Sequence, residues 1–299
     1  MSAELIVDAR NATGESPVWQ ADENALYWVD IPAGSLHRWQ LDGQTDCWQA
    51  DEMLACIARS EAGHWLGAQE SGLFKLRPQA DGRLAAEKLI GVEHARPRMR
   101  FNDGRCDRQG RFWASSMPTA MGADAVGALY RYDAQNPNDA SMLAPQLQEL
   151  VVPNGLAFSP DGSIMYLSDS HPSRQLIWAF DYDIDIDSGT PHNRRLFVDM
   201  NNHPGRPDGA AVDSHGCYWI CAIDAGLVLR FTPQGKLDRA LPVPVKKPTM
   251  CAFGGPRLDT LFVTSIRPQG IDLADQPLAG GVFALNPGVQ GLPEPKARA

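Results

Sequence analysis

Four polar side chains stand at equivalent places in four similar stretches of the sequence. Glu15 opens ESPVWQADENALYWVD, Asn102 opens NDGRCDRQGRFWASS, Asn154 opens NGLAFSPDGSIMYLSD and Asp208 opens DGAAVDSHGCYWICA. In each stretch the polar residue is followed by a small apolar run, a turn with Asp or Gly, and an aromatic run. Carboxylate and amide oxygens without histidine or thiolate are the ligands that hard divalent cations prefer. Taken alone, each position has an alternative, an ordinary turn residue, because Asp and Asn favour turns.

Two further stretches fit the same frame with a different leading residue. LACIARSEAGHWLGA begins at Leu54, and TMCAFGGPRLDTLFVTS begins at Thr249. The six leading positions, 15, 54, 102, 154, 208 and 249, are separated by 39 to 54 residues. Self-similar units of this length predict a six-bladed β-propeller, in which each blade is a four-stranded sheet packed on its neighbours. A pair of β-sandwiches or a large β-barrel does not explain why one hairpin pattern returns six times.

The rest of the sequence also favours an all-β chain. Apolar and aromatic runs of strand length recur between Gly, Pro, Asp and Asn turn signals, among them GLFKL, LIWAFDYD and GVFALN. Helical periodicity is weak, and its two candidates, LAAEKLIGVEHA and SMLAPQLQELV, are short enough to be decorations of loops. We expect one domain over residues 1–299. ELIVDA at 4–9 would complete the sheet that contains GVFALN at 281–286, and about 290–299 would form a loose tail.

The predicted propeller brings residues that are distant in sequence to one axis. The first strand of each blade lines the central channel, so the leading positions converge on it. Two of these positions are carboxylates that repel each other, and a divalent cation removes that cost. The residues therefore predict one divalent metal ion, Ca²⁺, Mg²⁺ or Mn²⁺ by ligand type, and Zn²⁺ is a further candidate because oxygen-rich open sites accept several metals.

Arg100 and His203 are candidates for contacts with a substrate. In RMRFNDGR, Arg100 stands two residues before Asn102, so both share one face of an extended strand and the guanidinium points at the channel mouth. It would hold a polar, oxygen-rich substrate; the alternative is a structural salt bridge with an aspartate. His203, in NNHPGRPDG, lies close to Asp208 and would overhang the channel as a substrate or proton-relay residue, unless it is a loop histidine without a role.

Charge and composition exclude several classes of partner. The chain of 299 residues has 36 acidic and 27 basic residues, a formal net charge of -9, and no Lys/Arg cluster that would follow a nucleic-acid backbone. Its first residues, MSAELIVDAR, lack the pattern of a secretory signal, and no apolar stretch approaches membrane-spanning length. We therefore expect a cytoplasmic protein, monomeric or weakly homo-oligomeric, with neither nucleic acid nor membrane as a partner.

Five short motifs occur together in the order seen in one known family. GESPVW at 14–19, RFNDG at 100–104, PNGLAFSPDG at 153–162, RPDGAAVD at 206–213 and AFGGP at 252–256 resemble the family of senescence marker proteins (regucalcin), gluconolactonases and luciferin-regenerating enzymes. The resemblance covers nearly the whole chain. It implies a six-bladed propeller with one catalytic divalent metal, held by Glu15, Asn154 and Asp208.

The same resemblance implies roles for residues that contact the substrate. Arg100 and Asn102 match residues that contact the sugar lactone in that family. Some members place a substrate-contacting Glu shortly before the GALY strand, where this chain has MGADAVGALY, so Asp124 is the candidate for that contact. The segment KKPTMCAFGGPRLDTLFVTSIRP is most similar to bacterial members that open aldonolactones.

Together these residues predict a sugar lactonase, a carboxylic ester hydrolase that opens an aldonolactone such as gluconolactone, arabinonolactone or galactonolactone. The metal would polarise the lactone carbonyl, and Asp208 would accept a proton from the attacking water. A phosphotriesterase-like hydrolase is an alternative, because a cation and a carboxylate also serve phosphoryl esters. A non-catalytic propeller that binds a metal or a partner is another, because this fold hosts both kinds of function.

Overall fold

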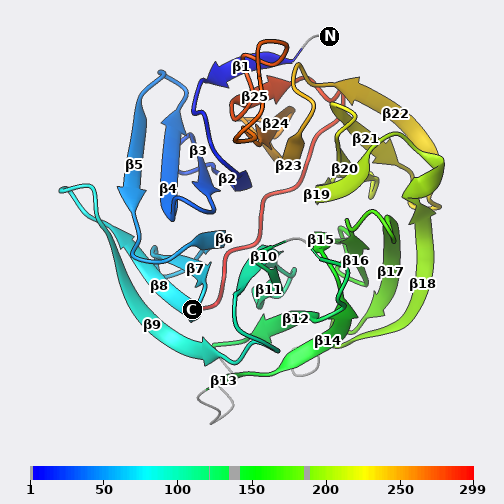
Figure 1. Ribbon diagram of the computed structural model, residues 1–299, viewed down its shortest axis with the longest axis horizontal. Helices are drawn as coiled ribbons and strands as arrows, with labels where there is room; N and C mark the ends of the chain where they lie inside the picture. Colours follow the sequence, from blue (N-terminus) through cyan, green and yellow to red (C-terminus); the bar gives the residue numbers. More distant parts are fainter. Residues whose placement is uncertain (1–2, 121, 135–141, 185–188) are drawn as a thin grey trace.

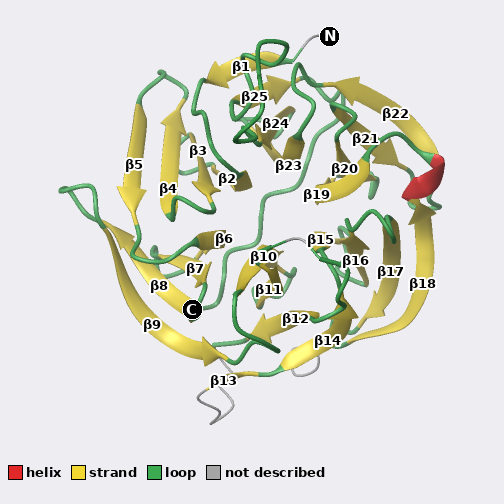
Figure 2. Cartoon of the chain, in the orientation of Figure 1, coloured by secondary structure: helices red, strands yellow, loops and turns green. Residues whose placement is uncertain are grey.

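Six β-sheets stand around a central axis in the computed structural model of the protein, which describes residues 3–120, 122–134, 142–184 and 189–299 (Figure 1). Each sheet contains one of the six repeats found in the sequence. Within these residues the only helix is a single 3₁₀ turn, η1 (Met200–Asn202), and strands form the rest of the regular structure (Figure 2). The predicted all-β, six-bladed propeller is confirmed.

Blades 1 to 3 place their first strand at the axis and the later strands progressively outward. Blade 1 comprises β2 (Gly14–Gln20), β3 (Ala25–Asp30), β4 (Ser35–Gln40) and β5 (Thr45–Gln49). Blade 2 comprises β6 (Leu54–Arg59), β7 (Trp65–Gln69), β8 (Gly72–Pro78) and β9 (Leu84–Val92), with the short β13 (Met142–Leu143) parallel to β9. Blade 3 comprises β10 (Met99–Cys106), β11 (Phe112–Pro118), β12 (Gly127–Tyr132) and β14 (Pro145–Leu150).

The second half of the ring is built in the same way. Blade 4 comprises β15 (Pro153–Phe158), β16 (Ile164–Asp169), β17 (Leu176–Tyr182) and β18 (Pro191–Asp199). Blade 5 comprises β19 (Arg206–Val212), β20 (Tyr218–Ile223), β21 (Leu227–Phe231) and β22 (Leu237–Pro242). Blade 6 comprises β23 (Pro248–Gly254), β24 (Thr260–Ser265), β25 (Val282–Leu285) and β1 (Glu4–Val7).

Blade 6 joins the two ends of the chain, as the sequence predicts. β1 pairs antiparallel with β25, with Glu4 opposite Ala284 and Leu5 opposite Phe283. The N-terminal strand thereby covers the edge that β25 would otherwise expose. Blade 6 also lies beside blade 1, so the ring is closed (Figure 1).

Both helix candidates from the sequence are strands. Residues 84–92 form β9, which pairs along its length with β8, and residues 142–150 contribute β13 and β14; Ser141 lies outside the described residues. Pro145 begins β14, where a proline would interrupt a helix. The edge of each blade supplies backbone hydrogen-bond partners to these segments, and that pairing outweighs their weak helical periodicity.

The predicted loose tail is wrong, because residues 290–299 are tied to the body of the propeller. Figure 1 shows the C-terminal segment crossing the middle of the ring. The N–H of Ala297 donates to the carbonyl of Arg59 at 2.7 Å, the N–H of Glu61 donates to the carbonyl of Ala297 at 2.9 Å, and the N–H of Arg298 donates to the carbonyl of Gly110 at 3.0 Å. Ala297 is buried. Backbone N–H and C=O groups in blades 2 and 3 form hydrogen bonds with this segment. These bonds order it although its Pro/Gly-rich composition favours disorder.

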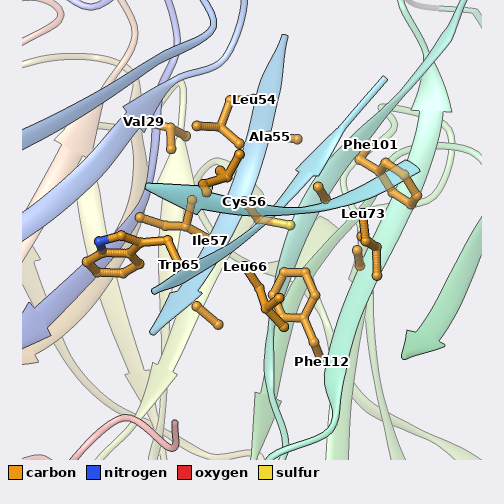
Figure 3. Packing of buried hydrophobic residues seen from close by; sticks show 14 of the residues in the cluster. Val29, Leu54, Ala55, Cys56, Ile57, Trp65, Leu66, Leu73, Phe101 and Phe112 are labelled. Atoms are coloured by element: carbon orange, nitrogen blue, oxygen red, sulfur yellow. The ribbon is translucent and has the colours of Figure 1, made fainter. Parts of the chain in front are cut away.

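Apolar side chains fill the space between neighbouring blades. In the largest cluster β6 lies between Val29 of blade 1 on one side and Phe101 and Phe112 of blade 3 on the other (Figure 3). Trp65 of β7 is fully buried in this cluster. Burial of such residues removes apolar area from water at roughly 25 cal/mol per Å² and holds the blades rigidly around the axis.

Candidate active site

The four polar leading residues lie at matching places on the inner strands. Glu15 is on β2, Asn102 on β10, Asn154 on β15 and Asp208 on β19, and each is at most 7% exposed. All four stand in the N-terminal half of their strand. The tail contacts the opposite ends of inner strands, at Arg59 of β6 and Arg105 of β10. The candidate site and the tail therefore occupy opposite ends of the channel.

A β-bulge or irregularity occurs at the leading position in all six inner strands. The register with the second strand shifts between Glu15/Val18, Leu54/Cys56, Phe101/Gly104, Asn154/Ala157, Pro207/Ala210 and Pro248/Cys251. A bulge bends a strand and re-aims its side chains, and bulges are common beside active sites. Ser16 (φ 49°) and Gly155 (φ 62°) take left-handed backbone conformations directly after two of the leading residues. The repeated bulge therefore directs these side chains to a common centre.

A continuous chain of hydrogen bonds links blades 3, 4 and 5. Arg100 Nη1 donates to Asn102 Oδ1 at 2.9 Å, and Asn102 Nδ2 donates to Asn154 Oδ1 at 2.9 Å. Asn154 Nδ2 donates to Ser170 Oγ at 2.8 Å, and that hydroxyl donates to the carbonyl of Pro207, directly before Asp208. These bonds fix which way the Asn102 and Asn154 amides point.

Glu15 and Asp208 form a buried acidic pair. Burial, and then the charges of Asp208 and Asp103, raise the pKa of Glu15 well above its usual range. Burial raises the pKa of Asp208 in the same way, although Arg206 and Lys247 oppose the shift. Within the described chain the Asp208 carboxylate makes no hydrogen bond or ion pair, and the Glu15 carboxylate accepts only from the Ser16 N–H at 3.3 Å. The negative charge of this pair is therefore poorly compensated by the protein.

Asp103 is a third buried carboxylate, whose charge acts on Glu15 and Asp208, and it was not among the predicted site residues. It is buried, its Oδ2 accepts from the Leu156 N–H at 2.8 Å, and its Oδ1 is buried without a hydrogen-bond partner among the described residues. Its charge raises the pKa of both Glu15 and Asp208. The repeat pattern assigns one leading residue to each blade, so Asp103, which directly follows Asn102 within the β-bulge of β10, falls outside it. Its position in RFNDGR, next to Asn102, was the available signal.

These donors fit a hard divalent cation. In the part of the chain that the structure describes, no group of three or more His, Cys, Asp or Glu is placed to hold a metal. The predicted ligand set contains only two such residues, Glu15 and Asp208, because its third donor is the amide of Asn154. The Asn154 Oδ1 is held by Asn102 and keeps a second lone pair, and the two carboxylates lack compensating partners among the described residues. Oxygen donors with uncompensated negative charge are what Ca²⁺, Mg²⁺ and Mn²⁺ require.

Arg100 brings a positive charge to the edge of this centre. Its guanidinium donates to the carbonyl of Phe101 at 2.7 Å and to Asn102, and it forms no ion pair with a carboxylate among the described residues. Burial lowers the pKa of Arg100, while the charges of Glu15 and Asp208 raise it. The structural salt bridge considered as the alternative is thus not found there. The remaining donors of Arg100 can bind an oxygen-rich ligand.

The structure does not join Asp124 or His203 to the acidic centre. Asp124 is exposed in the loop before β12 and forms an ion pair with Arg96 at 2.6 Å. His203 follows η1, and its ring packs edge-on against Phe231 with 5.1 Å between ring centroids. No contact described for these two side chains reaches Glu15 or Asp208. Their roles stay predictions.

Two aspartates at the ends of second strands hold the backbone just before the site. Asp30, the last residue of β3, accepts from the N–H groups of Ala12 and Thr13, both at 2.8 Å. Asp169, the last residue of β16, accepts in the same way from Val151 at 2.9 Å and Val152 at 3.0 Å. The final D of ALYWVD and of IMYLSD was the visible signal for this arrangement, which orders the segments leading to Glu15 and Asn154.

Fold and site together define a class, a six-bladed propeller with oxygen donors presented by bulged inner strands. The chain belongs to the SMP-30/gluconolactonase/LRE-like family, whose model matches residues 13–267. The resemblance found in the sequence is therefore confirmed. No helix in the described residues is long and apolar enough to cross a bilayer.

Relatives match the chain over nearly its full length. A 6-deoxy-6-sulfogluconolactonase of Pseudomonas putida is 41% identical over 295 residues, which cover 97% of this chain and 96% of that protein. A pentonolactonase of Haloferax volcanii is 31% identical, covering 98% of this chain and 97% of that protein. The crystal structure of regucalcin from Agrobacterium tumefaciens, described as a calcium-binding protein, has a TM-score of 0.88 and 26% identity and covers 100% of this chain and 98% of its own. Relatives named as lactonases confirm the predicted class of enzyme.

Proposed function

We propose that this protein is a metal-dependent sugar lactonase that hydrolyses an aldonolactone, such as gluconolactone, arabinonolactone or galactonolactone, to the aldonic acid. The observation that carries the proposal is the buried pair of Glu15 and Asp208 beside an oriented amide, Asn154, and the guanidinium of Arg100. The lactonase names of relatives at 41% and 31% identity support the same reaction class.

Glu15, Asn154 and Asp208 would hold one divalent cation. When bound, the cation would polarise the lactone carbonyl and stabilise the negative charge that develops on its oxygen. Calcium is one candidate, because regucalcin, a structural relative, is described as calcium-binding. Zn²⁺, Mn²⁺ and Mg²⁺ are the others, since an oxygen-rich site does not by itself select among them.

The chain's own residues would carry out the remaining tasks. Asp208 accepts the proton of the attacking water, because its buried carboxylate accepts no hydrogen bond from the described residues and keeps lone pairs free for that proton. Arg100 and Asn102 bind the hydroxyl groups of the sugar and align the carbonyl for attack. Asp124 and His203 are proposed as further substrate contacts at the rim. The cytoplasmic location and the monomeric or weakly oligomeric state also stay predictions.

The decisive experiment measures acid release from a panel of lactones by the metal-free protein and by the protein with each of the four cations. The panel includes gluconolactone, arabinonolactone, galactonolactone, a lactone sulfonated at carbon 6 and a phosphotriester. We expect rapid hydrolysis of at least one lactone, loss of activity after exhaustive EDTA treatment, and recovery on adding cation. Activity that survives EDTA would exclude the metal mechanism, and hydrolysis of the phosphotriester alone would favour the phosphotriesterase alternative. An inactive protein that binds cation would favour a non-catalytic propeller.

A further inference from the structure

Ser170 has a buried hydroxyl that contacts one candidate metal ligand, Asn154, and the residue directly before another, Asp208. It follows β16 and is 2% exposed. Its oxygen accepts from Asn154 Nδ2 at 2.8 Å, and its proton is donated to the carbonyl of Pro207. A serine hydroxyl has one proton to donate and can accept from other groups. Both capacities are therefore used to connect Asn154 of blade 4 with the peptide group that precedes Asp208 of blade 5.

The backbone of Ser170 is itself held firmly. Its N–H donates to the carbonyl of Val152 at 2.9 Å, and its own carbonyl accepts from Arg206 Nη1 at 3.2 Å. The preceding residue, Asp169, is fully buried and accepts from the backbone of Val151 and Val152. Ser170 is thus fixed by the protein itself in the absence of a ligand. A residue that orients other side chains must be fixed in this way.

The Asn154 amide is held at both of its polar atoms, so the loss of the Ser170 hydroxyl would change its orientation. Asn102 Nδ2 holds Oδ1 of Asn154, and Ser170 holds Nδ2. Without the hydroxyl, the amide keeps one of these two partners, and its oxygen is no longer confined to one direction. The carbonyl of Pro207 also loses its buried donor, so the peptide group that precedes Asp208 is held less firmly.

We propose that Ser170 is a positioning residue that sets the affinity for the divalent cation by fixing Asn154 and the Pro207–Asp208 peptide. The proposal rests on the proposed function only through the cation site, not through lactone hydrolysis. It does not make Ser170 a ligand or a catalytic residue. The contribution corresponds to a change of about 3- to 10-fold in cation affinity, the range supported by the loss of one neutral hydrogen bond.

The same strand supplies a matched control. Ser168 is fully buried on β16, two residues before Ser170, and its hydroxyl has no hydrogen-bond partner among the described residues. Ser168→Ala and Ser170→Ala therefore remove the same atom from neighbouring buried positions, but only the second breaks the bridge.

The test titrates Ca²⁺, Mn²⁺, Mg²⁺ and Zn²⁺ separately into the metal-free full chain by calorimetry, with no substrate present. We expect Ser170→Ala to weaken binding about 3- to 10-fold, Ser168→Ala to leave it unchanged, and Asn154→Ala to weaken it more. Ser170→Cys keeps the volume but donates weakly, so it should fall between wild type and alanine, and it serves if Ser170→Ala does not fold. Thermal unfolding of each metal-free variant shows whether the substitution lowers the stability of the whole protein.

Several outcomes would overturn the role of Ser170. Wild-type affinity in both Ser170 variants would do so, and so would an equal loss in Ser168→Ala. A wild-type protein that hydrolyses lactones without binding Ca²⁺, Mn²⁺, Mg²⁺ or Zn²⁺ would refute the positioning role and leave lactone hydrolysis standing. A protein that binds cation but hydrolyses no lactone, with the expected order of affinities, would support Ser170 and refute the lactonase proposal.

Discussion

Asn102 donates its side-chain amide to Oδ1 of Asn154 across the boundary between blades 3 and 4, at 2.9 Å. A residue predicted to contact the substrate therefore orients a residue predicted to bind the metal. The two tasks are coupled at this pair, and Arg100 is coupled to it in turn through Asn102 Oδ1.

Asn102→Ala and Arg100→Ala should accordingly have different effects. Loss of Asn102 frees the Asn154 amide, so we expect cation affinity to fall about 3- to 10-fold and KM to rise. Loss of Arg100 removes a contact to the substrate, so KM should rise about tenfold or more, while cation affinity should not fall because a positive charge beside Glu15 and Asp208 is also removed. Calorimetry with the cation alone and steady-state kinetics at saturating cation separate the two. Equal losses of cation affinity in both variants would contradict this division.

Asp208→Asn should abolish most hydrolysis even at saturating cation. The amide cannot accept the proton of water, and general-base catalysis contributes roughly 10²–10⁴-fold to kcat. The measurement is kcat at cation concentrations raised until binding, followed by calorimetry, is complete. Asp275→Asn is the control, because its exposed ion pair with Lys246 lies outside the centre. Full activity in Asp208→Asn or Asp208→Ala with cation retained would rule out the assignment of the base.

Glu15→Gln should stabilise the metal-free protein at neutral pH. Burial and the charge of Asp208 raise the pKa of Glu15, so the folded state binds more protons than the unfolded chain. Stability from this group is therefore present in acid and is lost as the pH rises through the raised pKa. The gain from Glu15→Gln should appear at neutral pH, shrink in acid, and shift the unfolding midpoint by a few degrees, on the order of 2–4 °C per kcal/mol.

Thermal unfolding in EDTA at neutral and acidic pH checks this ranking. Added cation should reverse it, because only the wild type then gains stability from binding. Glu87→Gln, at an exposed position on β9, is the control and should change little. A Glu15→Gln protein that is less stable than wild type in EDTA at neutral pH would show that the pair is compensated in a way the contacts do not reveal.

Asp103→Asn separates the charge of Asp103 from its structural bond. Asparagine can still accept from the Leu156 N–H, so the protein should fold normally while its cation affinity falls on the order of tenfold. Asp103→Ala also removes that acceptor and leaves a buried N–H without its partner, so it should lose about 1–3 kcal/mol of stability. Unfolding and cation titration of both variants test the distinction. Unchanged cation affinity in Asp103→Asn would assign Asp103 to structure alone.

Removal of residues 291–299 should destabilise the propeller. The tail is held by three backbone hydrogen bonds around Ala297 and Arg298 and by the ion pair of Arg105 with Glu294 at 3.2 Å. At about 0.5–1.5 kcal/mol for each hydrogen bond, we expect a loss of roughly 2–4 kcal/mol. Ala297→Arg should have a similar effect by placing a charge in a buried position, and Lys296→Ala, at an exposed position, should not. Wild-type unfolding of the truncated chain would restore the loose tail predicted from the sequence.

Local patterns in the sequence predict most of the fold and the four polar residues of the candidate site that lead the inner strands. The return of one hairpin pattern at six positions predicts blades because each unit can bury its apolar strands only against a neighbour. The type and register of Glu15, Asn102, Asn154 and Asp208 then predict convergence on the axis, because a ring places equivalent positions side by side. Both predictions can be made without knowing how the chain folds between the repeats.

The tertiary structure decided what depends on contacts between distant segments. The tail at 290–299 is ordered because unpaired backbone groups in blades 2 and 3 lie in its path, which no pattern within the tail predicts. The segments at 84–92 and 145–150 are strands because neighbouring strands pair with them.

The contacts of Asp103 and Ser170 also depend on the tertiary structure. Asp103 accepts from the Leu156 N–H of blade 4 and its charge acts on Glu15 of blade 1, and the packing of blade 4 on blade 5 sets the Ser170 hydroxyl between Asn154 and Pro207. Periodicity in the sequence records which residues are equivalent from blade to blade. Hydrogen bonds between blades join residues that are not equivalent, so only the folded chain reveals them.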